Sequence, residues 1–453
     1  MGKRVNGTGL AHRSSSIWRA SIAAIISLLF LSPFPFPPSP KFLHIDIANA
    51  DSATVSTATA EGRLAVFDDV WQTINARYYD ANFHGVDWWA QRAQFRSLAA
   101  EARDPEELYV VLRRLLSSLR DAHTRIYTPE QKFDWQHPRF ITIGLSLREI
   151  EGQLTVVSVE RKSEAEREGI RVGDVIQTID GKNALLTLER KLNEQIGSST
   201  PQAARLLALS SLADGPAGTT VAIEWFGADH KLRQTNLRRH WQQRILGVHI
   251  KHHGGIAVVT IDAFTQALES EFLASSSTLR RARGIVFDLR NNGGGDAEAM
   301  TEMASVFLPP ATGLGQFTDR NGNISLKLEA GVTPLLIHHL NDPIEVPLVI
   351  LTSERTSSAA EIFIAALKET EHVTVLGAET CGCVLAVRTQ HALPDGGELE
   401  VSELDYHTSA GVRLEGAGIK PDEVISLTRQ DIYAKRDPAL QTAFARLKSY
   451  PRH

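Results

Sequence analysis

Apolar residues recur at helical spacing in the first third of the chain. Val66, Val70 and Ile74 lie four positions apart, and a second series of leucines follows at 108, 112, 115 and 119. Residues three or four positions apart share one face of a helix, so this spacing predicts a helical domain of about three helices. No strand-like alternation interrupts the pattern, and we place this domain at residues 61–130.

Short runs rich in β-branched residues replace the helical pattern over residues 138–240. Strand-like runs at 154–159 and 220–225 flank several turn glycines and one helical run near 201–212. Alternating short strands and glycine turns predict a β-rich domain with one late helix.

Apolar strands alternate with helical patterns over residues 245–430. The runs 256–260, 284–289 and 347–351 are each followed by glycine-rich or serine-rich residues and then by a helical pattern. This alternation predicts an α/β domain. Residues 431–453 are expected to form a C-terminal helix or tail.

The first fifty residues predict export. Basic residues precede the apolar run 22–31, which is too short for a comfortable transmembrane helix. Ala48, Asn49 and Ala50 form a small-residue cleavage signature before Asp51. An uncleaved anchor remains the alternative and would be the sole contact with a membrane. In either case we expect the folded part outside the cytoplasm, in a periplasmic type of compartment.

Composition adds few constraints. Of the 453 residues, 43% are hydrophobic and 22% are charged, as in soluble globular proteins of two or three domains. A formal net charge of -5 gives no reason to expect a nucleic-acid partner. The oligomeric state is open.

Three polar segments that follow strands carry candidate chemistry. The first is DLRNNGGG (288–295), whose glycines form either a tight turn or a cradle of N–H groups for an oxyanion. The second is SERTSSAAEI (353–362), where serines precede a helix that starts near Ala359. A serine there is either a nucleophile at the positive end of the helix or a plain N-cap. The third is GAETCGCV (377–384), with EGAGIKPD (415–422) after it.

In this order the segments resemble the C-terminal processing (tail-specific) serine peptidases. The segments EAEREGIRVGDVIQTIDGK and GPAGTTVAIEWF resemble a PDZ domain of the bacterial protease kind. The resemblance covers about residues 61–430. It implies a multidomain α+β protein with an N-terminal helical domain, a PDZ-like β-rich domain and an α/β catalytic domain of the crotonase and Clp-protease type. It implies no cofactor and no metal.

The resemblance assigns roles to particular residues. Ser358 falls on the family's nucleophile, and the N–H groups of Gly295 and Ala359 fall on its oxyanion hole. Cys383 stands where the family usually has its catalytic lysine, which is a departure from the serine–lysine mechanism.

A branch that resembles the tricorn core protease pairs the serine with a histidine and a glutamate. His123 and Glu415 fall on these two positions. That branch has a serine immediately before the histidine, where this chain has Ala122. His123 can alternatively be a structural residue at the end of a helix.

The PDZ-like part implies binding of unstructured C-terminal tails of polypeptide substrates. Such domains add a peptide as a strand at a sheet edge and hold its carboxylate in backbone N–H groups. The segment with Gly144, Leu145 and Leu147 is the candidate, and an ordinary strand start is the alternative.

Cys381 and Cys383 are the two cysteines of the chain. A disulfide at this spacing would be strained, and two residues are too few for a metal site, so we expect small buried residues near the active site. Direct thiol catalysis by Cys383 is an outside alternative.

Two other functions compete with proteolysis. A catalytically silent relative would bind protein tails as a scaffold, and the missing lysine favours it. A crotonase-like acyl-transfer enzyme would share the α/β core but would leave the PDZ-like part unexplained.

Overall fold

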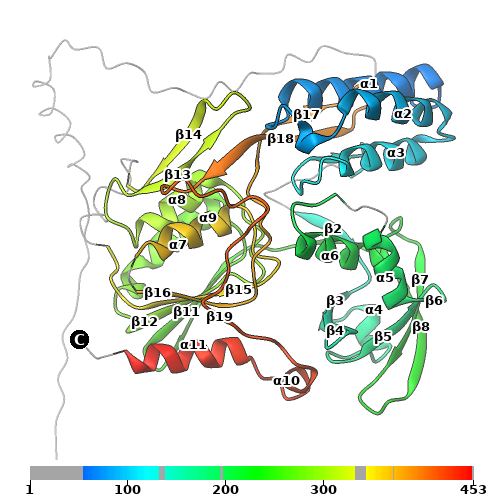
Figure 1. Ribbon diagram of the computed structural model, residues 1–453. Helices are drawn as coiled ribbons and strands as arrows, with labels where there is room; N and C mark the ends of the chain where they lie inside the picture. Colours follow the sequence, from blue (N-terminus) through cyan, green and yellow to red (C-terminus); the bar gives the residue numbers. More distant parts are fainter. Residues whose placement is uncertain (1–54, 132–137, 194–196, 332–342, 371, 451–453) are drawn as a thin grey trace, which may run out of the picture. The chain divides into compact units, whose positions relative to one another are not determined.

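The structure is a computed structural model that describes residues 55–450, except 132–137, 194–196, 332–342 and 371 (Figure 1). The predicted export signal lies outside the described residues. Within the unit Thr54–His453, four large hydrophobic clusters serve the helical region, the β-rich region and the two faces of an α/β sheet. Every helix in the described part is too short or too polar to cross a membrane.

Three α-helices form the first region, where the apolar spacing predicts helices, and the strand β1 follows them. Val66, Val70 and Ile74 are fully buried in the first helix, and Leu108 and Leu112 in the third. Each helix starts after a residue whose side-chain oxygen accepts a backbone N–H of the first turn. The elements are α1 (Ala60–Arg77), the 3-10 helix η1 (Phe83–Gly85), α2 (Trp88–Glu101) and α3 (Pro105–Ser117).

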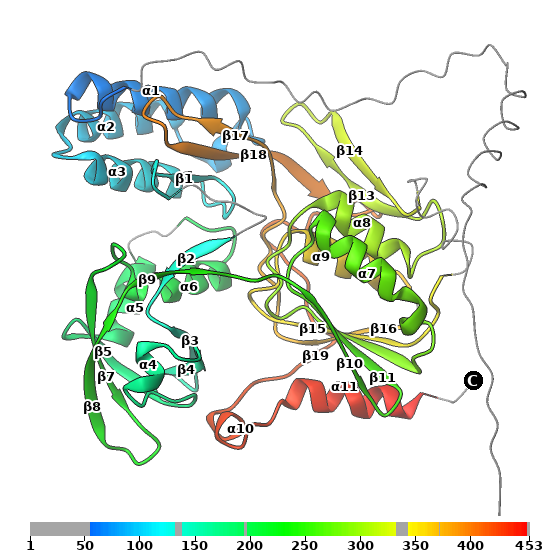
Figure 2. The same ribbon diagram turned by 180° about the vertical axis from the view of Figure 1, so that it is seen from behind.

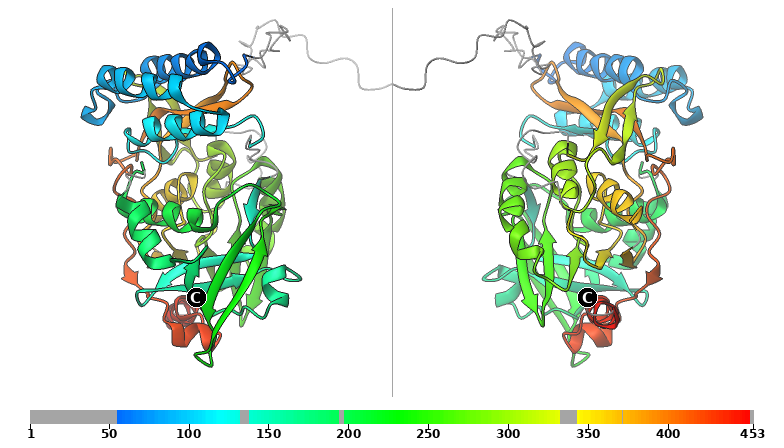
Figure 3. Two further views of the ribbon diagram at one scale, coloured as in Figure 1. Left: turned by 90° about the vertical axis from the view of Figure 1, so that its right-hand side faces the viewer. Right: turned by 90° about the vertical axis from the view of Figure 1, so that its left-hand side faces the viewer.

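A ribbon from much later in the chain completes the core of these helices. The strands β17 (Ala386–Ala392) and β18 (Glu398–His407) pair antiparallel, and Leu399 and Val401 are buried in the same cluster as the helices. Both views in Figure 3 show this ribbon, in orange, against the blue helices. The same sheet contains β1 (Arg125–Tyr127), β13 (Gly313–Thr318) and β14 (Ile324–Glu329).

A second sheet, in the order β3-β4-β5-β7-β8 with β6 beside β5, forms the β-rich region. The predicted late helix is present as α6, and a further helix, α5, which was not predicted, precedes it. A separate pair, β2 and β9, lies beside this sheet (Figure 2). The elements are β2 (Arg139–Thr142), β3 (Leu145–Ile150), β4 (Gln153–Val159), α4 (Glu164–Arg167), β5 (Val175–Ile179), β6 (Lys182–Asn183), α5 (Ala184–Asn193), α6 (Pro201–Ser210), the 3-10 helix η2 (Ser211–Ala213), β7 (Thr220–Phe226), β8 (Leu232–Arg238) and β9 (His240–Gln243).

The third region is a six-stranded sheet in the order β10-β11-β12-β15-β16-β19. The first strand is antiparallel to its neighbour and the others are parallel, as the predicted α/β alternation requires. The strands are β10 (Val248–His253), β11 (Ile256–Ile261), β12 (Gly284–Asp288), β15 (Leu348–Thr352), β16 (Val373–Gly377) and β19 (Glu423–Val424). The helices are α7 (Gln266–Leu279), α8 (Ala297–Ser305), α9 (Ala359–Lys368), α10 (Arg429–Tyr433) and α11 (Pro438–Ser449).

Helices cover both faces of this sheet. Ile285 and Phe287 of β12 face the cluster under α7, α8 and α9, whereas Val286 faces the cluster under α11 (Figure 1). Strands β12 and β15 are parallel neighbours, so the turns at their carboxyl ends meet at one edge of the sheet. The two candidate segments that follow these strands therefore lie together.

Candidate active site

Ser358 occupies a strained turn between β15 and α9. Its backbone has φ 56° and ψ -126°, a conformation that residues with a side chain rarely adopt. The helix begins at Ala359, as predicted, and the Ser358 side chain makes no capping hydrogen bond. The Ser358 N–H donates instead to the carbonyl of Cys383 at 2.9 Å and to Oε2 of Glu361 at 3.1 Å. The turn thus presents a hydroxyl that is not used to start the helix.

The glycine turn after β12 packs directly against this serine. Buried Asn292 fixes it, because its Nδ2 donates to the Ile261 carbonyl at 2.9 Å and its Oδ1 accepts the Gly294 N–H at 2.8 Å. Gly294 has φ +95°, and a Cβ there would lie 2.7 Å from the Ser358 Cβ. Only glycine allows this approach.

Two backbone N–H groups beside the hydroxyl are free to bind an anion. The N–H groups of Gly295 and Ala359 donate no hydrogen bond to any of the described residues. Gly294, which precedes Gly295, packs closely against Ala359: a Cβ added at Gly294 would lie 3.0 Å from the Ala359 nitrogen. An oxyanion hole needs two such N–H donors, and the sequence-based interpretation assigns this role to Gly295 and Ala359.

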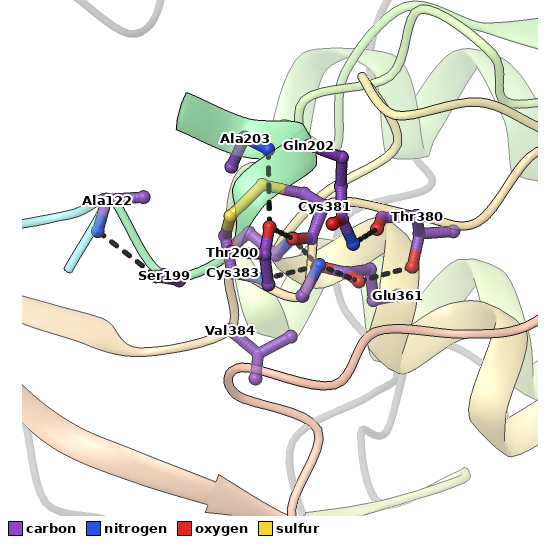
Figure 4. Close-up of a disulfide and its surroundings, with 12 residues drawn as sticks. Ala122, Ser199, Thr200, Gln202, Ala203, Glu361, Thr380, Cys381, Cys383 and Val384 are labelled. Carbon is purple, nitrogen blue, oxygen red and sulfur yellow. Dashed lines mark hydrogen bonds between the residues drawn. A yellow bond between two sulfur atoms is a disulfide. The ribbon is translucent and has the colours of Figure 1, made fainter. Parts of the chain in front are cut away.

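Glu361 organises the segment on the other side of Ser358. Its carboxylate is completely buried and accepts hydrogen bonds from the Thr380 hydroxyl, from the Gly382 N–H at 2.8 Å and from the Cys383 N–H at 3.0 Å (Figure 4). Burial raises the pKa of Glu361, and these hydrogen bonds oppose the rise. The sequence analysis assigned no role to Glu361, although its position three residues after Ser358 is typical of a capping interaction.

The expectation that this spacing disfavours a disulfide is wrong, because Cys381 and Cys383 are joined by one (Figure 4). Gly382 between them has φ +68°, and this left-handed turn brings the two Cα atoms to 5.2 Å, within the usual range for a disulfide. Both half-cystines are buried, as expected. Cys383 stands at the position of the family lysine, but its sulfur is bonded and carries no proton.

His123 lies in a turn that Asp121 holds firmly. Asp121 Oδ1 accepts the N–H groups of His123 and Thr124, both at 2.7 Å, and the hydroxyl of Ser402 at 2.9 Å. Burial and the charge of Arg125 together lower the pKa of His123 to about 4, and the charge of Asp121 partly opposes them. The imidazole is therefore neutral at neutral pH. Its Nδ1 is buried and has no hydrogen-bond partner among the described residues.

Glu415 is also buried, but it does not bind His123. Its Oε2 accepts the N–H groups of Val384 at 2.7 Å and of Leu385 at 3.2 Å. Burial is the main cause that raises the pKa of Glu415, and the charge of Asp121 acts in the same direction. The Val384 N–H and the charge of Arg413 oppose the rise, and the net pKa is about 7.

The structure brings the predicted catalytic residues into one neighbourhood without joining them. Ser358 bonds to the Cys383 carbonyl, and Ala122, next to His123, packs against the disulfide. In the described part of the chain no hydrogen bond links the side chains of Ser358, His123 and Glu415. The same residues contain no group of three or more His, Cys, Asp or Glu side chains placed to hold a metal ion.

The predicted peptide segment lies at an edge of the second sheet. Gly144 has φ +80°, and β3, with the half-buried Leu145 and Leu147, is the first strand in the order of that sheet. Helix α6 lies beside β3. The Gly144 N–H donates to Thr142 Oγ1 at 2.9 Å, so it is not available to a ligand in this conformation.

Comparisons with known proteins agree with this arrangement. Residues 255–425 match peptidase family S41, and residues 60–117 match the tricorn protease C1 domain. The carboxyl-terminal-processing protease of Synechocystis sp. is 25% identical over 367 residues, which are 78% of this chain and 79% of that protein.

Two solved structures share the fold. The photosystem II D1 C-terminal processing protease is 24% identical with a TM-score of 0.53, over 80% of this chain and 93% of that one. Mature CPAF complexed with lactacystin is 12% identical with a TM-score of 0.66, over 86% of this chain and 98% of that one. With the serine turn, the glycine turn and the sequence matches together, residues 255–425 form a peptidase domain of family S41, and the chain is a serine-type peptidase similar to the C-terminal processing proteases.

Proposed function

We propose that this peptidase cleaves internal peptide bonds with Ser358 as nucleophile, His123 as general base and Glu415 as the charge that stabilises the imidazolium. The observation that carries the proposal is the turn at Ser358. Its strained backbone sets the hydroxyl beside two free N–H groups, and backbone strain of this kind is concentrated at functional sites.

Each group has a defined task in this mechanism. A serine hydroxyl is a weak nucleophile until a base takes its proton, and neutral His123 can accept one. The Gly295 and Ala359 N–H groups then bind the oxyanion of the tetrahedral intermediate, each worth on the order of 3 kcal/mol. The protonated imidazole later gives its proton to the leaving amine. No thiol takes part, because both sulfurs are in the disulfide.

We propose further that the sheet of β3–β8 is a PDZ-like module that holds the C-terminal tails of polypeptide substrates. The relative from Synechocystis is named a carboxyl-terminal-processing protease. An open strand edge at β3 beside α6 supports the proposal, since an extended peptide adds to such an edge. Leu145 and Leu147 would contact the side chains of the tail.

An extracytoplasmic location is the third part of the proposal, with a mature chain that starts near Asp51. The bond between Cys381 and Cys383 supports it, because disulfides persist in oxidising compartments. N-terminal sequencing of the protein from its producing cell tests it, and a start at Met1 in the cytoplasmic fraction would reject it.

The nucleophile and the disulfide can be tested together. Ser358→Ala should lower the turnover of casein or of a tailed peptide by about 10³-fold or more. The double variant Cys381→Ser/Cys383→Ser should stay within about threefold of the original protein, because Gly382, Cys383 and Ser358 are linked through main-chain atoms. Circular dichroism confirms that both variants fold.

An inactive but folded double-serine variant would show that the sulfurs are needed for catalysis. If the original protein and Ser358→Ala bind tails equally and neither cleaves them, the scaffold function is correct.

The pH dependence of kcat/KM should reflect the titration of Glu415 rather than that of His123. Activity needs the ionised carboxylate, so kcat/KM should rise with pH through an apparent pKa of about 7, whereas His123, with its pKa of about 4, is already neutral there. Glu415→Gln should lose about tenfold at its maximum, on the order of 1–2 kcal/mol for one charge at an effective dielectric of 20. Its remaining acid limb should lie near the pKa of His123. A limb near 7 that persists in Glu415→Gln would assign the titration to another group.

Tail binding can be tested at Gly144 with a matched glycine as control. A methyl group at Gly144 would lie 2.8 Å from the Ser163 Cβ, whereas Gly152, with a similar φ of +71°, has no atom within 4 Å of its Cβ position. Gly144→Ala should raise KM for a tailed peptide about tenfold, or 1.4 kcal/mol, with a smaller effect on a short chromogenic ester. Gly152→Ala should leave both unchanged. Equal KM values for the two variants would remove this loop from the binding site.

A further inference from the structure

Arg290 connects the glycine turn after β12 with the start of helix α11. It is the third residue of the segment DLRNNGGG, and its guanidinium lies between two carboxylates. Its Nε and Nη2 donate to Asp288 at 2.8 and 2.6 Å, and its Nη1 and Nη2 donate to Asp437 at 3.0 and 2.7 Å. The side chains of Arg290, Asp288 and Asp437 are 28%, 20% and 36% exposed, so solvent screens these contacts only partly.

The two carboxylates hold the guanidinium in different ways. Asp288 is two positions away at the end of the same strand, so its hydrogen bonds shape the turn only locally. Asp437 comes from 147 positions later in the chain. Among the residues that the structure describes, it is the only distant group that binds this guanidinium. The pair of Arg290 and Asp437 therefore fixes the arginine side chain relative to the rest of the fold.

Asp437 is itself held from both sides. Its Oδ1 accepts the Leu440 N–H at 3.0 Å and caps α11, a helix that packs against the sheet through residues such as the fully buried Ala443 (Figure 1). On the other side, Tyr433 of α10 donates its hydroxyl to the Gly173 carbonyl of the β-rich region at 2.8 Å. The carboxylate is thus a fixed anchor for the guanidinium.

The main chain of Arg290 extends this connection to the nucleophile. Its carbonyl accepts the Ser353 hydroxyl at 2.5 Å, and Ser353 Oγ accepts the Arg355 N–H at 3.0 Å. Both residues belong to the turn that leads to Ser358. Arg290 also stands five positions before Gly295, in the turn assigned to the oxyanion hole. One residue therefore joins both turns of the site to α11.

Helix capping alone does not require a carboxylate at position 437. Asn, Asp and Ser are about equally good N-caps, because a cap needs one oxygen that accepts an N–H of the first turn. A two-point contact with an arginine needs the two charged oxygens of a carboxylate. The charge and the second oxygen of Asp437 therefore serve the contact with Arg290.

We propose that Asp437 is a positioning residue of the active site, which holds Arg290 and, through it, the glycine turn that carries Gly295. It does not touch the substrate. It keeps the Gly295 N–H at a fixed place relative to Ser358, where the oxyanion of the tetrahedral intermediate forms. This inference rests on the roles proposed above for Ser358 and Gly295.

The test is a series of helix caps at position 437. Asp437→Asn keeps the cap and one hydrogen bond to Arg290, whereas Asp437→Ser keeps only the cap, so α11 should start equally well in both variants. The kcat for a tailed peptide should fall about threefold in Asp437→Asn and about tenfold in Asp437→Ser, with KM within about twofold. The oxyanion forms only in the reaction, so a displaced donor lowers kcat and leaves substrate binding unchanged.

Glu423→Gln is the matched control. Glu423 forms an ion pair with Arg446 of α11 at 2.9 Å, and the two side chains are 44% and 42% exposed. The variant therefore removes an ion pair from the same helix without a change at the glycine turn. It should match the original protein in both kcat and KM.

Hydrogen exchange provides a readout that is independent of turnover. The N–H groups of Leu289 and Asn292 are hydrogen-bonded, so their exchange with deuterated solvent reports opening of the glycine turn. In a Ser358→Ala background, exchange at these two positions should be about tenfold faster with Asp437→Ser and intermediate with Asp437→Asn. Glu423→Gln should leave it unchanged.

These measurements distinguish a failure of the positioning role from a failure of the proposed mechanism. Equal exchange rates in Asp437→Ser and Glu423→Gln, or a kcat of Asp437→Ser equal to that of the original protein, would overturn the positioning role. If circular dichroism shows that Asp437→Ser does not fold, Asp437→Asn decides by the same criteria. If Ser358→Ala alone remains as active as the original protein, the proposed catalytic serine is wrong, and hydrogen exchange still decides whether Asp437 holds the glycine turn.

Discussion

The buried carboxylate of Glu361 is the interaction on which the geometry of the site depends. It is fully buried and accepts N–H groups from Ser358, Gly382 and Cys383 as well as the Thr380 hydroxyl. Burial of a carboxylate is unfavourable unless such donors surround it. Any arrangement that moves a donor away therefore costs free energy. This requirement fixes the segment 380–383 against the start of α9. The backbone strain at Ser358, of order 1–3 kcal/mol, persists because the surrounding hydrogen bonds hold this residue in its strained conformation.

The sequence predicts the parts of the site that arise from local patterns. Strand, polar turn and helix follow one another at 284–305 and at 348–368, and the parallel register of β12 and β15 then brings the two turns together. The tight turn at Gly294 and the helix start at Ala359 can be predicted for the same reason: local backbone conformation determines both.

Contacts across long sequence separations could not be predicted in this way. The disulfide depends on the left-handed turn at Gly382, which Glu361 holds from 21 residues earlier. The partners of Glu415 are the backbone N–H groups of Val384 and Leu385, about 30 residues earlier, rather than His123. Periodicity records which face of an element is buried, but it does not record which distant polar group lies opposite.

The site also requires contacts between regions of the fold. His123 follows the helical region, and Ser358 follows β15. Ser199, which precedes α6 beside the edge strand β3, accepts the N–H of the residue before His123. Arg148 of β3 forms an ion pair with Glu354 at 2.8 Å, four residues before the nucleophile. Both side chains are half-buried, where an ion pair has more orienting value than at the open surface. A movement of β3 would therefore shift the turn that carries Ser358, through the Arg148–Glu354 ion pair and through α6.

The replacement of the lysine by a half-cystine changes the electrostatics of the reaction. A disulfide is neutral, so it supplies neither a base nor a cation near the nucleophile. In the proposed mechanism His123 accepts the serine proton, yet with a pKa of about 4 it is a weak base in the resting protein. Glu415, with a pKa of about 7, is close to half-ionised at neutral pH.

In the proposed mechanism the two groups act on each other through charge. Protonation of the imidazole would favour the ionised carboxylate of Glu415, and the ionised carboxylate would in turn make His123 a stronger base. The pair is therefore most effective when the proton leaves Ser358, because each charge that develops then stabilises the other. A Ser–His–Glu site can work without the lysine on this basis, provided that the distance between the carboxylate and the imidazole stays fixed.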